Sequence, residues 1–171
     1  MVISCAKKQI GMGEPSKPAY WKPEQKAGVG DTDAYNKAEA ERQARLRELA
    51  RSQKLRDEIQ MFEYEKIYFD FDNSELKPDA RAVLKKKAQW LRTNSRFSLR
   101  VEGHCDERGT NEYNLALGER RANVALKFLN ALGISTHRMS TISYGEERAA
   151  DQGHNEGAWS KNRRDEFKLT K

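Results

Sequence analysis

Strand-like and helix-like segments alternate from residue 64 to the end of the chain, and their order is the strongest constraint on the fold. Residues 67–71 are β-branched and aromatic, and residues 97–103 alternate apolar with polar side chains, as strands do. Each is followed by apolar residues at helical spacing, the first run beginning near Pro78 and the second ending at Gly133. The remaining predicted elements are strands at 139–145 and 163–169, with a polar loop from 146 to 161 between them. This β-α-β-α-β-β order predicts an α+β domain, with a mixed sheet and both helices packed on one face.

The region before this domain divides into two parts of different composition. Residues 1–30 hold three of the four prolines and no apolar period, which predicts a flexible tether. Residues 31–63 lack Gly and Pro and are rich in strong helix formers, so we expect a helix there. Its apolar positions are too irregular for a sustained heptad repeat. We therefore expect a solvated helical stalk whose last turns pack on the domain at 64–171, with a coiled-coil dimer as the alternative.

Charge narrows the classes of partner. The formal net charge is +6, and acidic and basic residues are interspersed rather than grouped. This pattern is typical of a solvated surface and is compatible with attraction to anionic cell-wall or membrane surfaces. A basic stripe with interleaved aromatic residues is missing from the sequence, which argues against nucleic acid as a partner. No apolar run approaches the roughly 20 residues of a transmembrane helix.

Several motifs occur in a fixed order in the C-terminal region. They are Tyr68-Phe69-Asp70-Phe71-Asp72, the run from Val101 to Asn114 (VEGHCDERGTNEYN), the run from Leu115 to Ala122 (LALGERRA), the run from Thr141 to Glu146 (TISYGE) and Asn162-Arg163-Arg164. Together they resemble the OmpA-like domain family, and the second and third are similar to its peptidoglycan-associated lipoprotein (Pal) branch. The resemblance covers about residues 67–171. It implies an OmpA-like fold and a non-enzymatic outer-membrane lipoprotein of the Tol-Pal system, which binds peptidoglycan non-covalently and serves envelope integrity and cell division. It also implies a TolB-like β-propeller protein as a partner.

The resemblance also implies a site for the diaminopimelate residue of the peptidoglycan stem peptide. That ligand carries an ammonium beside a carboxylate, so a receptor needs an anion and a forked cation close together. Asp106 matches the family's ammonium-binding aspartate, and Arg121 matches its carboxylate-binding arginine. Asp106 follows a predicted strand and Arg121 lies on the next helix, so the fold can bring them together. Further matched positions, which line or rim the pocket, are Phe71, Asp72, Thr110 and Leu117.

Simpler explanations exist for the same residues. Asp106 could cap a turn, Arg121 could form a surface ion pair, and Phe71 could belong to the core. If the two charged residues do bind ligand, we expect their replacement by alanine to remove binding and leave the fold intact.

The two cysteines lead to separate expectations. Val2-Ile3-Ser4-Cys5 resembles a bacterial lipobox, which implies lipidation of Cys5 and attachment to the outer membrane, facing the periplasm. Cys105 would then be an unpaired, buried thiol, although two thiols also allow one disulfide.

The sequence leaves three other functions to consider. Catalysis by Cys105 with His104 is disfavoured because adjacent side chains in an extended segment point apart. A zinc site at His104, Cys105 and another histidine lacks the usual paired spacing, so we expect no bound metal and no cofactor. A periplasmic protein-docking scaffold that does not bind the wall itself is the alternative to wall binding.

Overall fold

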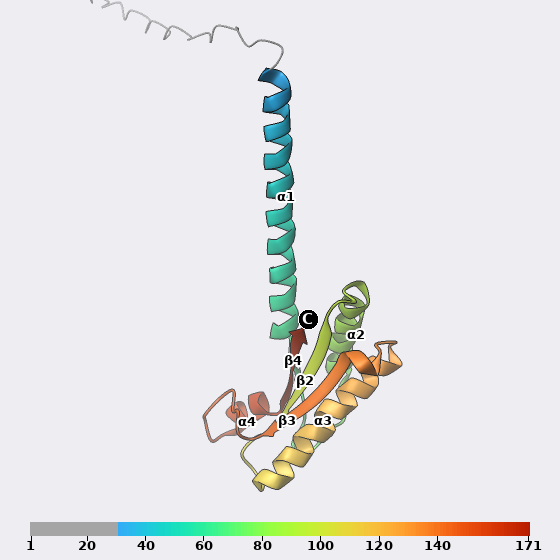
Figure 1. The fold of residues 1–171 in the computed structure, drawn as a ribbon. Helices are drawn as coiled ribbons and strands as arrows, with labels where there is room; N and C mark the ends of the chain where they lie inside the picture. Colours follow the sequence, from blue (N-terminus) through green and yellow to red (C-terminus); the bar gives the residue numbers. More distant parts are fainter. Residues whose placement is uncertain (1–30) are drawn as a thin grey trace, which may run out of the picture. The chain divides into compact units, whose positions relative to one another are not determined.

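The computed structural model describes residues 31–171, so the predicted tether and Cys5 lie outside the described residues. Two compact units divide the chain after Arg45, and the fold below concerns the unit that begins at Leu46. Within the described part, no helix is long and apolar enough to span a bilayer. The elements, drawn in Figure 1, are α1 (Asp31–Tyr64), β1 (Ile67–Tyr68), α2 (Pro78–Thr93), β2 (Ser98–His104), α3 (Asn111–Ala131), the 3-10 turn η1 (Thr136–Arg138), β3 (Met139–Gly145), α4 (Glu156–Asn162) and β4 (Arg164–Thr170).

The four strands form one mixed sheet in the order β1-β4-β2-β3. β2 and β3 run parallel, whereas β4 is antiparallel to both β1 and β2. The parallel pair needs a crossover, and α3 supplies it by lying along β2 and β3 (Figure 1). The mixed sheet predicted from the sequence is confirmed.

One face of the sheet carries the hydrophobic core. Leu99 and Val101 on β2 and Phe167 on β4 pack with apolar side chains of both α2 and α3, so the two helices cover the same face as predicted. Close approach of α3 depends on glycine, since a Cβ at Gly103 would lie 2.0 Å from the carbonyl oxygen of Gly118. This contact holds the start of α3 against the C-terminal end of β2, where the charged cavity described below is located.

The last turns of α1 pack on this core, as expected for the end of the helical segment. Phe62 is buried and its ring centroid lies 5.0 Å from that of Trp90. Lys87 donates a hydrogen bond to the carbonyl oxygen of Phe62 and lies over the rings of Phe62 and Phe167, at 4.3 and 4.4 Å from their centroids. Burial lowers the pKa of Lys87 to about 7, with partial compensation from Glu65 and Glu63.

Two local predictions were wrong. The first strand extends only over Ile67–Tyr68 rather than to Phe71, because the chain turns at Asp72, which has a φ of 50°. The expected loop from 146 to 161 contains helix α4, which begins where the side chain of Asn155 accepts a hydrogen bond from the main-chain N–H of Ala158. An Asn cap followed by Glu156 in the first turn is a helix-start pattern that the sequence did contain.

Candidate functional site

A cavity of about 180 Å³ lies where β2 gives way to the loop that leads into α3. It collects charged and aromatic groups from both ends of the domain's sequence, because β4 lies between β1 and β2. The lining residues are Phe71, Asp72, Cys105, Asp106, Arg108, Gly109, Tyr113, Asn114, Leu117, Arg121 and Arg163.

Asp106 is the anionic centre of this cavity. Its side chain is only 3% exposed, and its Oδ2 accepts hydrogen bonds from Arg108 Nη2 at 2.7 Å and Arg163 Nη1 at 3.0 Å. Burial by itself raises the pKa of this carboxyl, but the hydrogen bonds from Arg108 and Arg163 outweigh it and hold the pKa below its usual value. Asp106 is therefore ionised at neutral pH.

Arg108 is the more accessible cation. Its guanidinium lies between two rings, 3.9 Å from the centroid of Phe71 and 4.2 Å from that of Trp159. Such stacking favours the planar guanidinium over an ammonium group. Its side chain stays partly exposed, so it can also meet a ligand.

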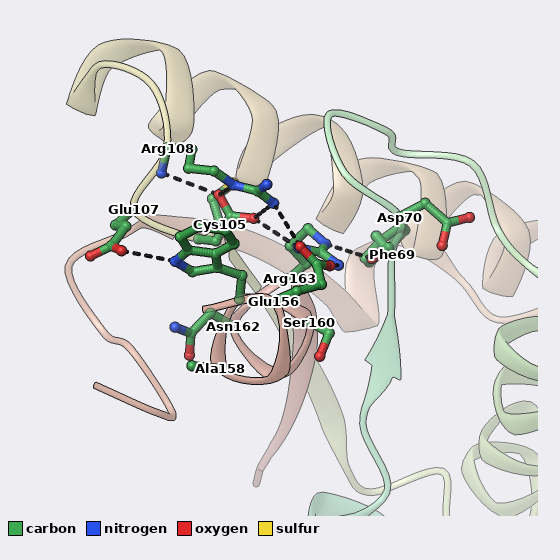
Figure 2. Close-up of polar contacts among 12 residues, drawn as sticks. Phe69, Asp70, Cys105, Glu107, Arg108, Glu156, Ala158, Ser160, Asn162 and Arg163 are labelled. Atoms are coloured by element: carbon green, nitrogen blue, oxygen red, sulfur yellow. Dashed lines mark hydrogen bonds and ion pairs between the residues drawn. The ribbon is translucent and has the colours of Figure 1, made fainter. Parts of the chain in front are cut away.

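Arg163 connects the cavity with β1 and α4. Its Nη2 lies 2.5 Å from Glu156 Oε1, and its Nε donates to the carbonyl oxygen of Phe69 at 3.1 Å. Figure 2 shows Arg163, Glu156 and Arg108 converging in this ion-pair network, with the first strand on one side and α4 below. The network fixes the orientation of Asp106.

Arg121 lines the same cavity but is fully buried, with 0% exposure. Its guanidinium donates to three main-chain oxygens and one sulfur: Asn73 O at 2.9 Å, His104 O at 2.9 Å, Asp70 O at 3.1 Å and Cys105 Sγ at 3.4 Å. These contacts tie the segment after β1 to the end of β2. A guanidinium has five N–H groups, so these four contacts leave one N–H on Nη2. Arg121 is thus a structural residue as well, contrary to the expectation that it can be replaced without cost to the fold.

The other predicted site residues divide between the cavity and its supports. Phe71 is 56% exposed and is not part of the core, whereas Leu117 is buried beside the cavity. Asp72 accepts a hydrogen bond from the hydroxyl of Tyr113. Thr110 is not among the lining residues, and its hydroxyl caps α3 by accepting from the main-chain N–H of Tyr113 at 3.3 Å.

Cys105 has the properties of an inert thiol. It is buried, its Sγ donates to the carbonyl oxygen of Asn114 at 3.3 Å, and burial raises its pKa to about 11. The neighbouring His104 stacks on Tyr144 at a centroid distance of 5.5 Å and makes no hydrogen bond to the thiol. This pair therefore lacks the contact that an activated cysteine nucleophile needs.

Four residues of the network were not predicted as site residues from the sequence. Arg163 and Arg108 lie inside the quoted motifs without an assigned role in ligand binding, and Glu156 and Trp159 lie outside all of them. Arg108 lies two residues after Asp106, which is a natural reach for a guanidinium that folds back on a carboxylate. Trp159 and Glu156 were hidden because their segment was taken for a loop rather than helix α4.

The fold and the cavity define an α+β domain that presents a small, charged pocket beyond the end of a central strand. Residues 68–163 match the model of the OmpA family, and the chain belongs to that family. The peptidoglycan-associated lipoprotein of Brucella melitensis is 50% identical over 100 residues, which are 58% of this chain and 60% of that protein. The peptidoglycan-associated lipoprotein of Pseudomonas aeruginosa is 43% identical over 114 residues, 67% of each chain. The match to the Brucella protein thus spans three-fifths of that relative's length.

Solved structures agree with this assignment. The crystal structure of the peptidoglycan-associated lipoprotein from Burkholderia pseudomallei is 37% identical, with a TM-score of 0.60 over 61% of this chain and 89% of that one. The C-terminal domain of Helicobacter pylori MotB has a TM-score of 0.59, covering 63% of this chain and 84% of that one, at 19% identity. At that identity the MotB comparison shows a shared fold and nothing further.

Proposed function

We propose that this chain binds peptidoglycan non-covalently and holds the diaminopimelate residue of the stem peptide in the cavity around Asp106. The observation that carries the proposal is that Asp106 and Arg121 line the same small cavity, together with Asp72 and Arg108. Opposite charges within one small cavity suit a ligand group that carries both an ammonium and a carboxylate. The names of the relatives support the same function, since they are peptidoglycan-associated lipoproteins.

Each charged group has a role in this proposal. The ligand ammonium is accepted by Asp106, whose carboxylate is kept ionised by Arg108 and Arg163. The ligand carboxylate accepts from the remaining N–H of Arg121 and from the partly exposed guanidinium of Arg108, which keeps its position against Phe71. Partial exclusion of water strengthens both contacts relative to bulk solution.

The remaining predicted residues shape the pocket. Phe71 forms an apolar wall and holds the Arg108 guanidinium in place by stacking. Asp72 and Leu117 contribute an acceptor and an apolar patch, and Thr110 acts at the rim by ordering the start of α3.

The wider role is proposed from the family resemblance. Lipidation of Cys5 would hold the chain in the outer membrane, facing the periplasm, with residues 1–30 as tether, residues 31–63 as helical stalk and residues 64–171 as the wall-binding domain. The stalk in this proposal is solvated, with a coiled-coil dimer as the alternative. Within a Tol-Pal system, a TolB-like β-propeller protein would be the protein partner. The activity is binding rather than catalysis.

Sedimentation with purified sacculi tests the proposal. Phe71→Ala removes an exposed ring from the cavity wall, and Tyr68→Ala is a matched control because Tyr68 is 45% exposed and does not line the cavity. We expect Phe71→Ala and Arg108→Ala to weaken co-sedimentation by about tenfold or more, as loss of a stacked or charged contact does. Tyr68→Ala should sediment like the unmodified chain.

The outcomes separate wall binding from the scaffold alternative. If the unmodified chain stays in the supernatant while a TolB-like protein still binds it, the chain is a docking scaffold. If the chain sediments and both cavity variants sediment equally well, the wall is bound elsewhere on the surface.

A further inference from the structure

A second polar cluster lies on the sheet face that α2 and α3 leave uncovered. Val101 and Gly103 on β2 face the helices, so the alternating residues Glu102 and His104 point to the other side. Glu166 on β4 is the register partner of Glu102 and joins them there. One potential ligand atom from each of these three side chains lies within 4.8 Å of the other two.

The imidazole of His104 is buried in this cluster without a hydrogen bond. The side chain is 2% exposed, and neither ring nitrogen has a hydrogen-bond partner. A buried polar atom without a partner is uncommon and costly, because its hydration is lost and not replaced. Because neither ring nitrogen is engaged, the imidazole has a lone pair available to a further ligand.

In each of the two carboxylates, one oxygen accepts the hydrogen bonds and the other remains available to a metal ion. The hydrogen bonds to Glu102 fall on Oε1, from Arg100 Nε at 2.8 Å. Those to Glu166 also fall on Oε1, from Lys66 Nζ at 2.8 Å and Arg164 Nε at 2.7 Å. Carboxylates that bind a metal through one oxygen are commonly hydrogen-bonded through the other.

We propose that Glu102, His104 and Glu166 form a site for a divalent transition-metal ion of the zinc type. One imidazole and two carboxylates suit zinc with water in the open position, whereas an imidazole ligand is poorly suited to calcium or magnesium. The site differs from a zinc site at His104, Cys105 and another histidine, because Cys105 takes no part in it. Its occupation would cross-link β2 and β4, and it is independent of the cavity around Asp106.

The surrounding cations set how tightly such an ion is held. Lys66, Arg100 and Arg164 bring three positive charges to two carboxylates, so they compete with the metal. Lys66 has a flexible, partly exposed side chain and a single ammonium group, so it can swing into solvent when a metal ion binds Glu166. Replacing Lys66 should therefore tighten metal binding. A purely structural role of His104 would not produce this effect.

The test is a titration of the full chain with Zn²⁺. Binding is monitored by calorimetry and by the ¹⁵N resonances of the histidine rings. Variants are made in a His137→Ala, His154→Ala background, so that His104 is the remaining imidazole. We expect Zn²⁺ to shift the His104 ring resonances, Glu166→Gln to weaken binding by at least about tenfold, and Lys66→Gln to tighten it by about threefold or more.

His104→Gln is a further variant, but the ring resonances of the background protein and the Glu166→Gln arm do not depend on its folding. Unshifted His104 resonances at saturating Zn²⁺ would overturn the proposal. So would Zn²⁺ binding that is unchanged by Glu166→Gln, since the ion would then lie elsewhere on the chain.

Discussion

Arg163 Nη1 lies 3.0 Å from Asp106 Oδ2, and both side chains are almost fully buried. Asp106 follows β2 and Arg163 precedes β4, and the antiparallel pairing of these two strands brings the residues together across 57 positions of sequence. Arg108 completes the arrangement on the same oxygen, so one carboxylate holds two guanidinium groups. The stability of the domain and the chemistry of its cavity therefore depend on the same ion pair.

Loss of the Asp106 charge should destabilise the domain at neutral pH. Asp106→Asn leaves the buried Arg163 with Glu156 as its remaining acidic partner, and breaking a buried ion pair costs about 3 kcal/mol or more. Urea denaturation measures this difference, with Asp57→Asn on the exposed face of α1 as the control. Equal unfolding free energies for Asp106→Asn and the unmodified chain would contradict the prediction.

The ion pair between Asp106 and Arg163 also predicts how the stability of the domain changes at acidic pH. The folded pKa of Asp106 lies below its unfolded value of about 3.9, so its stabilising contribution is present above that value and is lost as the pH falls through the folded pKa. The stability gap between the unmodified chain and Asp106→Asn should therefore shrink below about pH 4. A gap that stays constant down to pH 2 would contradict this explanation.

Replacement of the adjacent residues Arg120 and Arg121 on α3 should have very different effects on the free energy of unfolding. Arg121→Ala leaves the carbonyl groups of Asp70, Asn73 and His104 without their donor, so we expect a loss of about 3 kcal/mol or more. Arg120→Ala removes an exposed side chain and should change the unfolding free energy by less than about 0.5 kcal/mol. Thermal or urea unfolding of the two variants makes this comparison, and similar losses for both would show that Arg121 is not structural.

The contact between β2 and α3 should not tolerate a methyl group. In Gly103→Ala the new Cβ would lie 2.0 Å from the carbonyl oxygen of Gly118, which is main chain and cannot move aside alone. We expect severe destabilisation or failure to fold. Gly133→Ala is the comparison, because nothing lies within 4 Å of its Cβ and only the strain of a φ of 89° remains, about 1 kcal/mol. A Gly103→Ala variant as stable as Gly133→Ala would contradict the close approach.

Lys87 should make stability rise on the alkaline side of neutrality. Its pKa is lowered from 10.5 to about 7 in the folded chain, so the unfolded chain binds more protons between these values. Stability therefore increases as the pH rises from about 7 to about 10, by an amount on the order of 4 kcal/mol if nothing else titrates. Lys87→Met should remove this rise, as measured by urea denaturation at pH 6.5, 8 and 9.5. An unchanged slope in the variant would assign the effect to another group.

The sequence predicted the parts of the fold that rest on periodicity. Helices α2 and α3 and strands β2, β3 and β4 have clear apolar patterns. Their order was sufficient to predict a mixed sheet with both helices on one face. The short first strand and α4 were mispredicted because turn geometry at Asp72 and a single cap at Asn155 decide them. These local choices leave little trace in hydrophobic periodicity.

The candidate site was predictable only in part. Asp106 and Arg121 could be proposed from the motifs, and they do line one cavity. The involvement of Arg163 with Asp106 depends on the pairing of β4 with β2, which is a long-range contact. The depth of Arg121 likewise depends on the path of the chain after β1, because Asp70 and Asn73 supply carbonyl groups that enclose it.

The most direct test of the wall-binding account is an NMR titration of the ¹⁵N-labelled chain with a soluble stem peptide that contains meso-diaminopimelate. A peptide with lysine at that position is the control, because it keeps the ammonium and lacks the neighbouring carboxylate. The account predicts shifts at Phe71, Asp106, Arg108 and Leu117, and much weaker binding of the lysine peptide. No shifts at these four residues, or equal affinity for the two peptides, would contradict it.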